Sequence, residues 1–150
     1  MDERALYGPI KAFLEGQGYE VKGEVGAADL VAVRGDAAPV IVELKTGFSL
    51  TLFHQAIARL ALTDTVYVAV SHGSGRPWQK ARARNLSLCR RLGLGLLTVR
   101  VDTGEVVVHL DPGPYAPRKN AARRDRLLKE FAERVGDPNE GGTRGVRMTA

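Results

Sequence analysis

Two apolar runs joined by a short turn, residues 28–45, limit the possible folds of this chain more than any other stretch. Val, Ile and Leu dominate both runs, and glycine and proline interrupt them, which is typical of two strands joined by a turn. Folded symmetrically about Asp36, this hairpin places Asp29 opposite Glu43, with Cβ atoms about 5 Å apart on one face of the sheet. Because side chains alternate along a strand, Lys45 shares the face of Glu43. The hairpin therefore predicts three ionisable groups at one end of an apolar sheet.

These three ionisable groups favour one kind of chemistry. Two carboxylates held this close repel each other, and a cation between them removes that cost. Carboxylate oxygens suit Mg²⁺, with Mn²⁺ as the expected substitute, so Asp29 and Glu43 are candidate metal ligands. A divalent ion activates a bound water and stabilises charge on a phosphoryl oxygen, and Lys45 would orient or deprotonate that water or neutralise the transition state. The pattern favours metal-dependent phosphodiester hydrolysis.

A purely structural explanation of the same residues stays open. The runs beside Asp29 and Glu43 are continuously apolar, which indicates strands covered on both faces, where an unpaired charge is costly. In that case Lys45 forms a buried ion pair with Asp29 or Glu43. A second Glu-x-Lys triplet, residues 20–22, is interpreted as part of a solvent-exposed strand. Glu24, just before the hairpin, is an additional candidate for the site.

Four segments of the chain resemble a known family. They are residues 6–19, 26–33, 42–45 and 54–60, which read LYGPIKAFLEGQGY, GAADLVAV, VELK and HQAIARL. The chain has an Asp, a gap, a Glu-x-Lys at the end of an apolar strand, and a following helix with Gln. This order is similar to the motif of the PD-(D/E)xK phosphodiesterase (nuclease) superfamily. Within it, the chain looks most like an uncharacterised bacterial family of phosphodiesterases of this type, mainly over residues 3–110.

The resemblance implies a restriction-endonuclease-like core and roles for individual residues. Asp29 and Glu43 match the metal ligands, and Lys45 matches the catalytic lysine. Gln55 matches a polar residue often found on the following helix. Glu3 is the candidate for the acidic residue of the first helix, although it lies about one helical turn upstream of the usual position. The chain departs from the motif in that alanine precedes Asp29 where the motif has proline.

Charge is unevenly distributed along the chain. Residues 1–50 carry net −3, residues 51–100 net +7 and residues 101–150 net +1, within a total of +5. Positive charge next to an acidic site suits a polyanion, and DNA is the expected substrate. The helix expected over residues 78–92 has basic but no acidic residues, and its candidates for contact with nucleic acid are Lys80, Arg82, Arg84, Arg90 and Arg91. A solvated, Arg-rich surface would give the same composition.

Hydrophobic periodicity predicts an α/β fold with a central mixed β-sheet and helices on both faces. The strands are expected near residues 19–25, 28–34, 40–45, 65–70 and 95–101, with an edge strand at 106–110. The helices are expected over residues 3–17, about 49–62, 78–92 and 118–135. We expect a nuclease-like core over residues 1–111, a linker and amphipathic helix over 112–135, and a flexible tail over 136–150.

Composition narrows the class of protein further. One Cys excludes an internal disulfide framework, and no apolar run approaches the ~20 residues that span a bilayer, so a cytoplasmic location is expected. Three scattered His and one Cys do not form a zinc-binding pattern. Two other functions stay open. One is a non-catalytic nucleic-acid-binding module on the same fold, and the other is a protein-interaction subunit, including a homodimer through the helix at 118–135.

Overall fold

The structure is a computed structural model and describes residues 3–137. The chain divides into two units, Met1–Ala116 and Pro117–Ala150. Most of the tail predicted over residues 136–150 lies outside the described residues.

Within the described residues, the first unit contains three helices and six strands. They are α1 (Arg4–Glu15), β1 (Glu20–Val25), β2 (Ala28–Val33), β3 (Val40–Leu44), α2 (Leu50–Arg59), β4 (Val66–Ser71), α3 (Gly75–Leu92), β5 (Gly95–Arg100) and β6 (Glu105–Leu110). The second unit contains α4 (Ala121–Glu133). None of these helices has the length and apolar character needed to cross a bilayer.

The six strands form one mixed sheet whose spatial order follows the sequence, β1 to β6. The pairs β1–β2, β2–β3 and β5–β6 are antiparallel. The pairs β3–β4 and β4–β5 are parallel, because α2 and α3 carry the chain back to the start of the next strand. The carboxyl ends of β3, β4 and β5 therefore meet at one end of the sheet, which is where open α/β sheets bind ligands.

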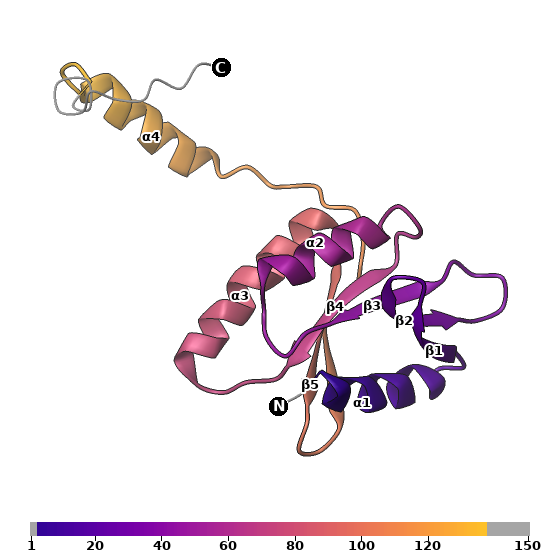
Figure 1. Cartoon of the computed structure of the whole chain (residues 1–150). Coiled ribbons are helices and arrows are strands. Elements are labelled where there is room, and N and C mark those ends of the chain that lie inside the picture. The colour runs from indigo at the N-terminus through magenta and orange to yellow at the C-terminus, as the bar shows by residue number, and fades with distance from the viewer. Residues whose placement is uncertain (1–2, 138–150) are drawn as a thin grey trace. The chain divides into compact units, whose positions relative to one another are not determined.

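Each face of the sheet has its own hydrophobic core. On one face α1 buries Leu6, Ile10 and Leu14 against residues of β2, β3 and β5. On the other face α2 and α3 pack on β3, β4 and β5, with Leu52, Phe53 and Cys89 among the buried residues. Figure 1 shows α1 on one side of the sheet and α2 with α3 on the other. This confirms the predicted α/β fold, and it is consistent with a restriction-endonuclease-like core.

Two helices differ from expectation at proline residues. Proline inside a helix usually kinks or breaks it, yet α1 continues through Pro9. Proline removes one backbone hydrogen bond, but complete burial of Leu6 and Ile10 holds this helix on the sheet. The helix α3 begins at Gly75 rather than Trp78, since Pro77 lies in its first turn, where a missing N–H is tolerated.

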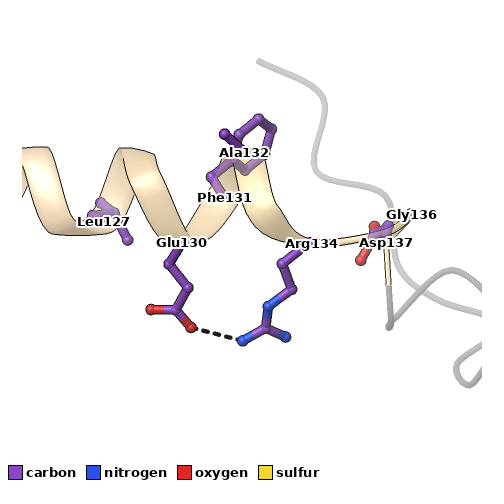
Figure 2. A pocket seen from close by; sticks show the side chains of 7 residues that line it. All are labelled: Leu127, Glu130, Phe131, Ala132, Arg134, Gly136 and Asp137. Carbon is purple, nitrogen blue, oxygen red and sulfur yellow. Dashed lines mark hydrogen bonds and ion pairs between the residues drawn. The ribbon is translucent and has the colours of Figure 1, made fainter.

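The helix α4 is amphipathic and has no buried residues. Its N-terminus is capped by Asn120, whose side-chain oxygen accepts a hydrogen bond from the N–H of Arg123 at 3.0 Å. Figure 2 shows Glu130 and Arg134 on one side of its C-terminal end, joined by an ion pair of 2.7 Å. The large apolar side chains of this segment are exposed, namely Leu127, Leu128, Phe131 and Val135.

Candidate active site

The antiparallel pair β2–β3 has the register expected for a hairpin symmetric about Asp36. Leu30 pairs with Val42, and the backbone ladder between the two strands ends there. Beyond it, the N–H of Asp29 donates to Glu43 Oε2 at 3.0 Å, and the N–H of Leu44 donates to Asp29 Oδ2 at 2.9 Å. Each carboxylate thus takes a backbone N–H from the opposite strand in place of a carbonyl. The two acidic side chains lie side by side at the end of the hairpin.

Glu43 is buried, and its charge is balanced by a residue of α2. Only 1% of its side chain is exposed, and Arg59 Nε lies 2.6 Å from Oε1. The same guanidinium donates to the carbonyl of Ala27 at 2.7 Å, so that one side chain joins α2 to both strands of the hairpin. Arg59 was not predicted as a site residue. Two features of the sequence could have predicted Arg59 as the partner of Glu43. A buried glutamate needs a cation, and Arg59 lies one helical turn after Gln55.

Opposing causes act on the pKa of Glu43. Burial is the largest cause and raises this pKa, and the negative charge of Asp29 raises it further. The hydrogen bonds from the Asp29 N–H and from Arg59 act in the other direction. A divalent cation next to Asp29 would favour the ionised form of Glu43 by the same electrostatic rule. The pair therefore has the character of a cation site, with one cationic partner already supplied by Arg59.

Lys45 follows directly after β3 and pairs with the first helix. Its Nζ lies 3.4 Å from Oε1 of Glu3, the residue before α1. Within residues 3–137, neither Asp29 nor Glu43 forms the ion pair with Lys45 that was considered as a structural alternative. The structure thus brings Glu3 to the site despite its upstream position in the sequence.

An open cavity of about 500 Å³ lies beside these residues on the side of α1. Its lining residues are Glu3, Arg4, Tyr7, Gly23, Glu24, Asp29 and Leu44. Tyr7 packs directly on Gly23, where a Cβ atom would lie 2.9 Å from its ring. Glu24 has a φ of +52°, a backbone conformation that costs about 1–3 kcal/mol for a residue other than glycine. Three candidate acidic residues, Glu3, Glu24 and Asp29, therefore line one cavity.

Gln55 lies on α2 and is half-buried. Residues four apart share one face of a helix, so Gln55 is on the same face as Arg59, which contacts Glu43. The structure places it on the helix that follows β3, and its role in the site stays a prediction.

The five basic residues of α3 that are candidates for contact with nucleic acid do not share one face. At about 100° per residue, Lys80, Arg84 and Arg91 fall within roughly 40° of one another and form an exposed stripe. Arg90 is also exposed but lies to one side of this stripe. Arg82 is half-buried and points elsewhere, with its guanidinium carbon 5.9 Å from the ring centre of Trp78. A straight phosphate backbone along α3 would therefore meet the stripe rather than all five residues.

The residues present fit a hard divalent cation. Within the described part of the chain, no group of three or more His, Cys, Asp or Glu has a metal-binding arrangement. Mg²⁺ does not need one, because it is usually held by one or two carboxylates and keeps several waters. Asp29 lines a cavity with room for water. Glu43 is buried beside it, with Oε1 bonded to Arg59 and Oε2 to the Asp29 N–H, so an ion would share these oxygens with those partners.

A comparison with family models finds a match over the last third of the chain. Residues 97–150 match the family described as "Putative PD-(D/E)XK phosphodiesterase (DUF2161)". This match agrees with the family suspected from the sequence, but it overlaps the predicted region of resemblance, residues 3–110, only at residues 97–110. The matched segment comprises most of β5, all of β6 and the residues that follow, and it does not include Asp29, Glu43 or Lys45. A search of curated proteins finds no match.

Proposed function

We propose that the chain is a divalent-metal-dependent phosphodiesterase that hydrolyses nucleic acid, with DNA as its substrate. One observation carries the proposal, namely the pair of adjacent carboxylates, Asp29 and Glu43, at the carboxyl end of β3 with Lys45 next in the chain. The family match supports a phosphodiesterase of the PD-(D/E)XK type. The metal ion and the DNA substrate are the parts that this proposal adds.

Asp29 and Glu43 would hold Mg²⁺, or Mn²⁺ in its place. When bound, the ion supplies a more acidic water and stabilises negative charge on a phosphoryl oxygen. Asp29 presents its carboxylate to the cavity, while Arg59 and the Asp29 N–H favour the ionised form of Glu43, which a cation requires. Glu24 lines the same cavity and is a candidate for an outer contact with metal-bound water.

Lys45 would act on the phosphate and on the attacking water. Glu3 holds its ammonium group by an ion pair, which keeps the positive charge at the end of β3. From there the ammonium can orient the water or neutralise charge that develops on the phosphoryl oxygens. Gln55, on the α2 face that also carries Arg59, would hold the same water or a neighbouring phosphate.

The exposed stripe of α3 would hold the flanking backbone of the substrate. Lys80, Arg84 and Arg91 point to one side, and Arg90 is exposed on a neighbouring side of the helix. Each contact between such a cation and a phosphate releases a bound counterion and contributes to affinity without reading sequence.

The proposal is tested by incubating the chain with duplex DNA, single-stranded DNA and RNA in Mg²⁺, in Mn²⁺ and in EDTA. We expect cleavage of DNA with either ion and none in EDTA. Binding of nucleic acid without cleavage of any substrate would instead favour the non-catalytic binding module.

Substitution of Asp29 tests the metal site without an activity assay. Asp29→Asn keeps an oxygen for the Leu44 N–H and removes the charge that raises the pKa of Glu43, so the metal-free variant should equal or exceed the wild type in stability. Mn²⁺ at about 100 times its Kd should stabilise the wild type by roughly 2.7 kcal/mol. In thermal melts this appears as a rise of several degrees in Tm, which we expect the variant to lack.

The matched control is Asp36→Asn, the same change in the exposed turn at the other end of the hairpin. It should leave the Mn²⁺ effect intact. The gain in metal-free stability of Asp29→Asn should vanish on acidification, because a raised pKa of Glu43 costs stability only above the unfolded carboxyl pKa near 4.5. A clear loss of metal-free stability, with no change in the Mn²⁺ effect, would make Asp29 a structural residue.

A second candidate function concerns α4. Its exposed Leu127 and Phe131 side chains, 65% and 79% accessible, support an interaction role, including a homodimer through residues 118–135. Such an interface would leave the proposed chemistry at Asp29 and Glu43 unchanged.

A further inference from the structure

A second cluster of titratable side chains lies at the carboxyl ends of the parallel strands. His72 Nδ1 lies 2.9 Å from Thr98 Oγ1, and the same oxygen lies 2.7 Å from His109 Nε2. The three residues come from the end of β4, from β5 and from β6. Thr98 is fully buried. These residues, the His72–Thr98–His109 cluster, have no part in the site described above.

Aromatic and cationic groups of α3 cover this cluster. The rings of His72 and Trp78 have centres 4.5 Å apart, and the two imidazoles lie nearly parallel at 6.2 Å. Trp78 comes so close to Gly73 that a Cβ atom there would lie 2.4 Å from its ring, so that only glycine fits. Arg82 reaches back toward Trp78 from the next turn. The first turn of α3 is thus packed on the imidazole of His72.

The hydrogen bonds to Thr98 limit how many of the two histidines can be protonated. A threonine hydroxyl has one proton, and a ring nitrogen that accepts it belongs to a neutral imidazole. If both imidazoles were protonated, both would donate to Thr98 Oγ1, and the buried hydroxyl proton would need another acceptor. In the free chain the cluster therefore favours at least one neutral histidine.

Burial and the nearby charges also favour the neutral forms of His72 and His109. Burial is the largest cause that lowers the pKa of both His72 and His109. Arg82 on α3 lowers both, and Arg100 on β5 lowers that of His72, while Glu105 on β6 opposes this change. Arg100 also pairs with Glu105, with Nε 3.7 Å from Oε2, so its charge is partly balanced. An anion next to Arg82 and the two imidazoles would relieve the repulsion among them.

The cluster adjoins the proposed active site. The N–H of Ser71, the residue before His72, donates to the carbonyl of Thr46 at 3.3 Å, and Thr46 follows Lys45. Since β3 and β4 are parallel, His72 and Lys45 leave the sheet at the same end.

We propose that the His72–Thr98–His109 cluster, together with Arg82 and Arg100, binds a backbone phosphate of the nucleic acid substrate and takes up a proton when it does so. The inference rests on the proposed function for its substrate class. A phosphate offsets the two arginines and favours imidazolium, whose second ring N–H then donates to a phosphate oxygen. Substrate affinity becomes linked to pH through this contact.

The test is the affinity for a labelled DNA duplex, measured by fluorescence anisotropy in EDTA at constant ionic strength from pH 8 to pH 6. We expect the affinity of the wild type to rise by up to about tenfold, the effect of a shift of one unit in one pKa. His72→Gln should flatten this profile and weaken binding at pH 6 severalfold. His109→Gln, a second variant in case His72→Gln unfolds, should reduce the slope as well.

The matched control is His54→Gln on the exposed side of α2, which should keep the wild-type profile. An unchanged slope in folded His72→Gln and His109→Gln, or no binding of DNA at either pH, would overturn the inference. Because the assay contains no divalent ion, its result is separate from that of the cleavage test. Binding that depends on His72 in a chain that never cleaves would leave this inference standing and remove the catalytic proposal.

Discussion

We expect Lys45→Ala to abolish the proposed cleavage of DNA while the chain stays folded. We expect a fall in rate of about 10²–10⁴-fold, the range for removing a group that moves a proton or stabilises developing charge. The fold should survive because the Lys45 side chain is one-third exposed and its ion pair with Glu3 is near solvent, where such pairs contribute little to stability. Cleavage in Mg²⁺ and a thermal melt measure the two effects separately.

The chain provides its own control for this variant. Glu20 and Lys22 form a second Glu-x-Lys triplet on β1, with their side chains 71% and 73% exposed and 3.7 Å apart. Lys22→Ala should leave the rate of cleavage unchanged. Glu43→Ala should be as inactive as Lys45→Ala, whereas wild-type rates in either variant would refute the assigned roles.

Arg59→Ala should destabilise the first unit by about 3–5 kcal/mol at neutral pH. The reason is that it leaves the carboxylate of Glu43 buried without its cationic partner. Chemical denaturation measured at pH 7 gives the change in the free energy of unfolding. The double variant Arg59→Ala with Glu43→Gln should recover a large part of the loss, because no buried charge remains.

The pH dependence of the stability loss in Arg59→Ala distinguishes an unpaired buried carboxylate from a simple loss of packing. Burial already raises the pKa of Glu43, and removal of the Arg59 hydrogen bond raises it further. A carboxyl group whose pKa is raised on folding loses stability as the pH rises above its unfolded value, near 4.5. The deficit of Arg59→Ala should therefore be largest at neutral pH and shrink toward pH 4.5. A deficit that stays constant would mean that Arg59 acts through its apolar contacts.

The hairpin could be predicted well because residues close together in the sequence determine its register. A turn with glycine and proline sets the register, and alternation of side chains then puts Asp29 opposite Glu43. The positions of Glu3 and Arg59 were harder to predict, since each depends on how a helix docks on the sheet. The docking of α1 and α2 is decided by burial of apolar side chains on the two faces, and these contacts form between segments distant in sequence.

The His72–Thr98–His109 cluster was even harder to predict from the sequence. Thr98 and His109 come from β5 and β6 and His72 follows β4, so their meeting depends on how segments distant in sequence pair in the sheet. Scattered histidines in the sequence gave no sign of it. The basic helix was recognised from its composition, but only the packing of α3 separates Arg82 from the exposed stripe.

The crossed hydrogen bonds at the end of the hairpin have a consequence for observing the site. The amide protons of Asp29 and Leu44 are each bonded to an acidic side chain rather than to a carbonyl. Any change in the charge or orientation of either carboxylate must therefore alter the chemical shift and the solvent-exchange rate of an amide on the facing strand. These two backbone resonances make the hairpin a built-in spectroscopic reporter of what its acidic groups are doing.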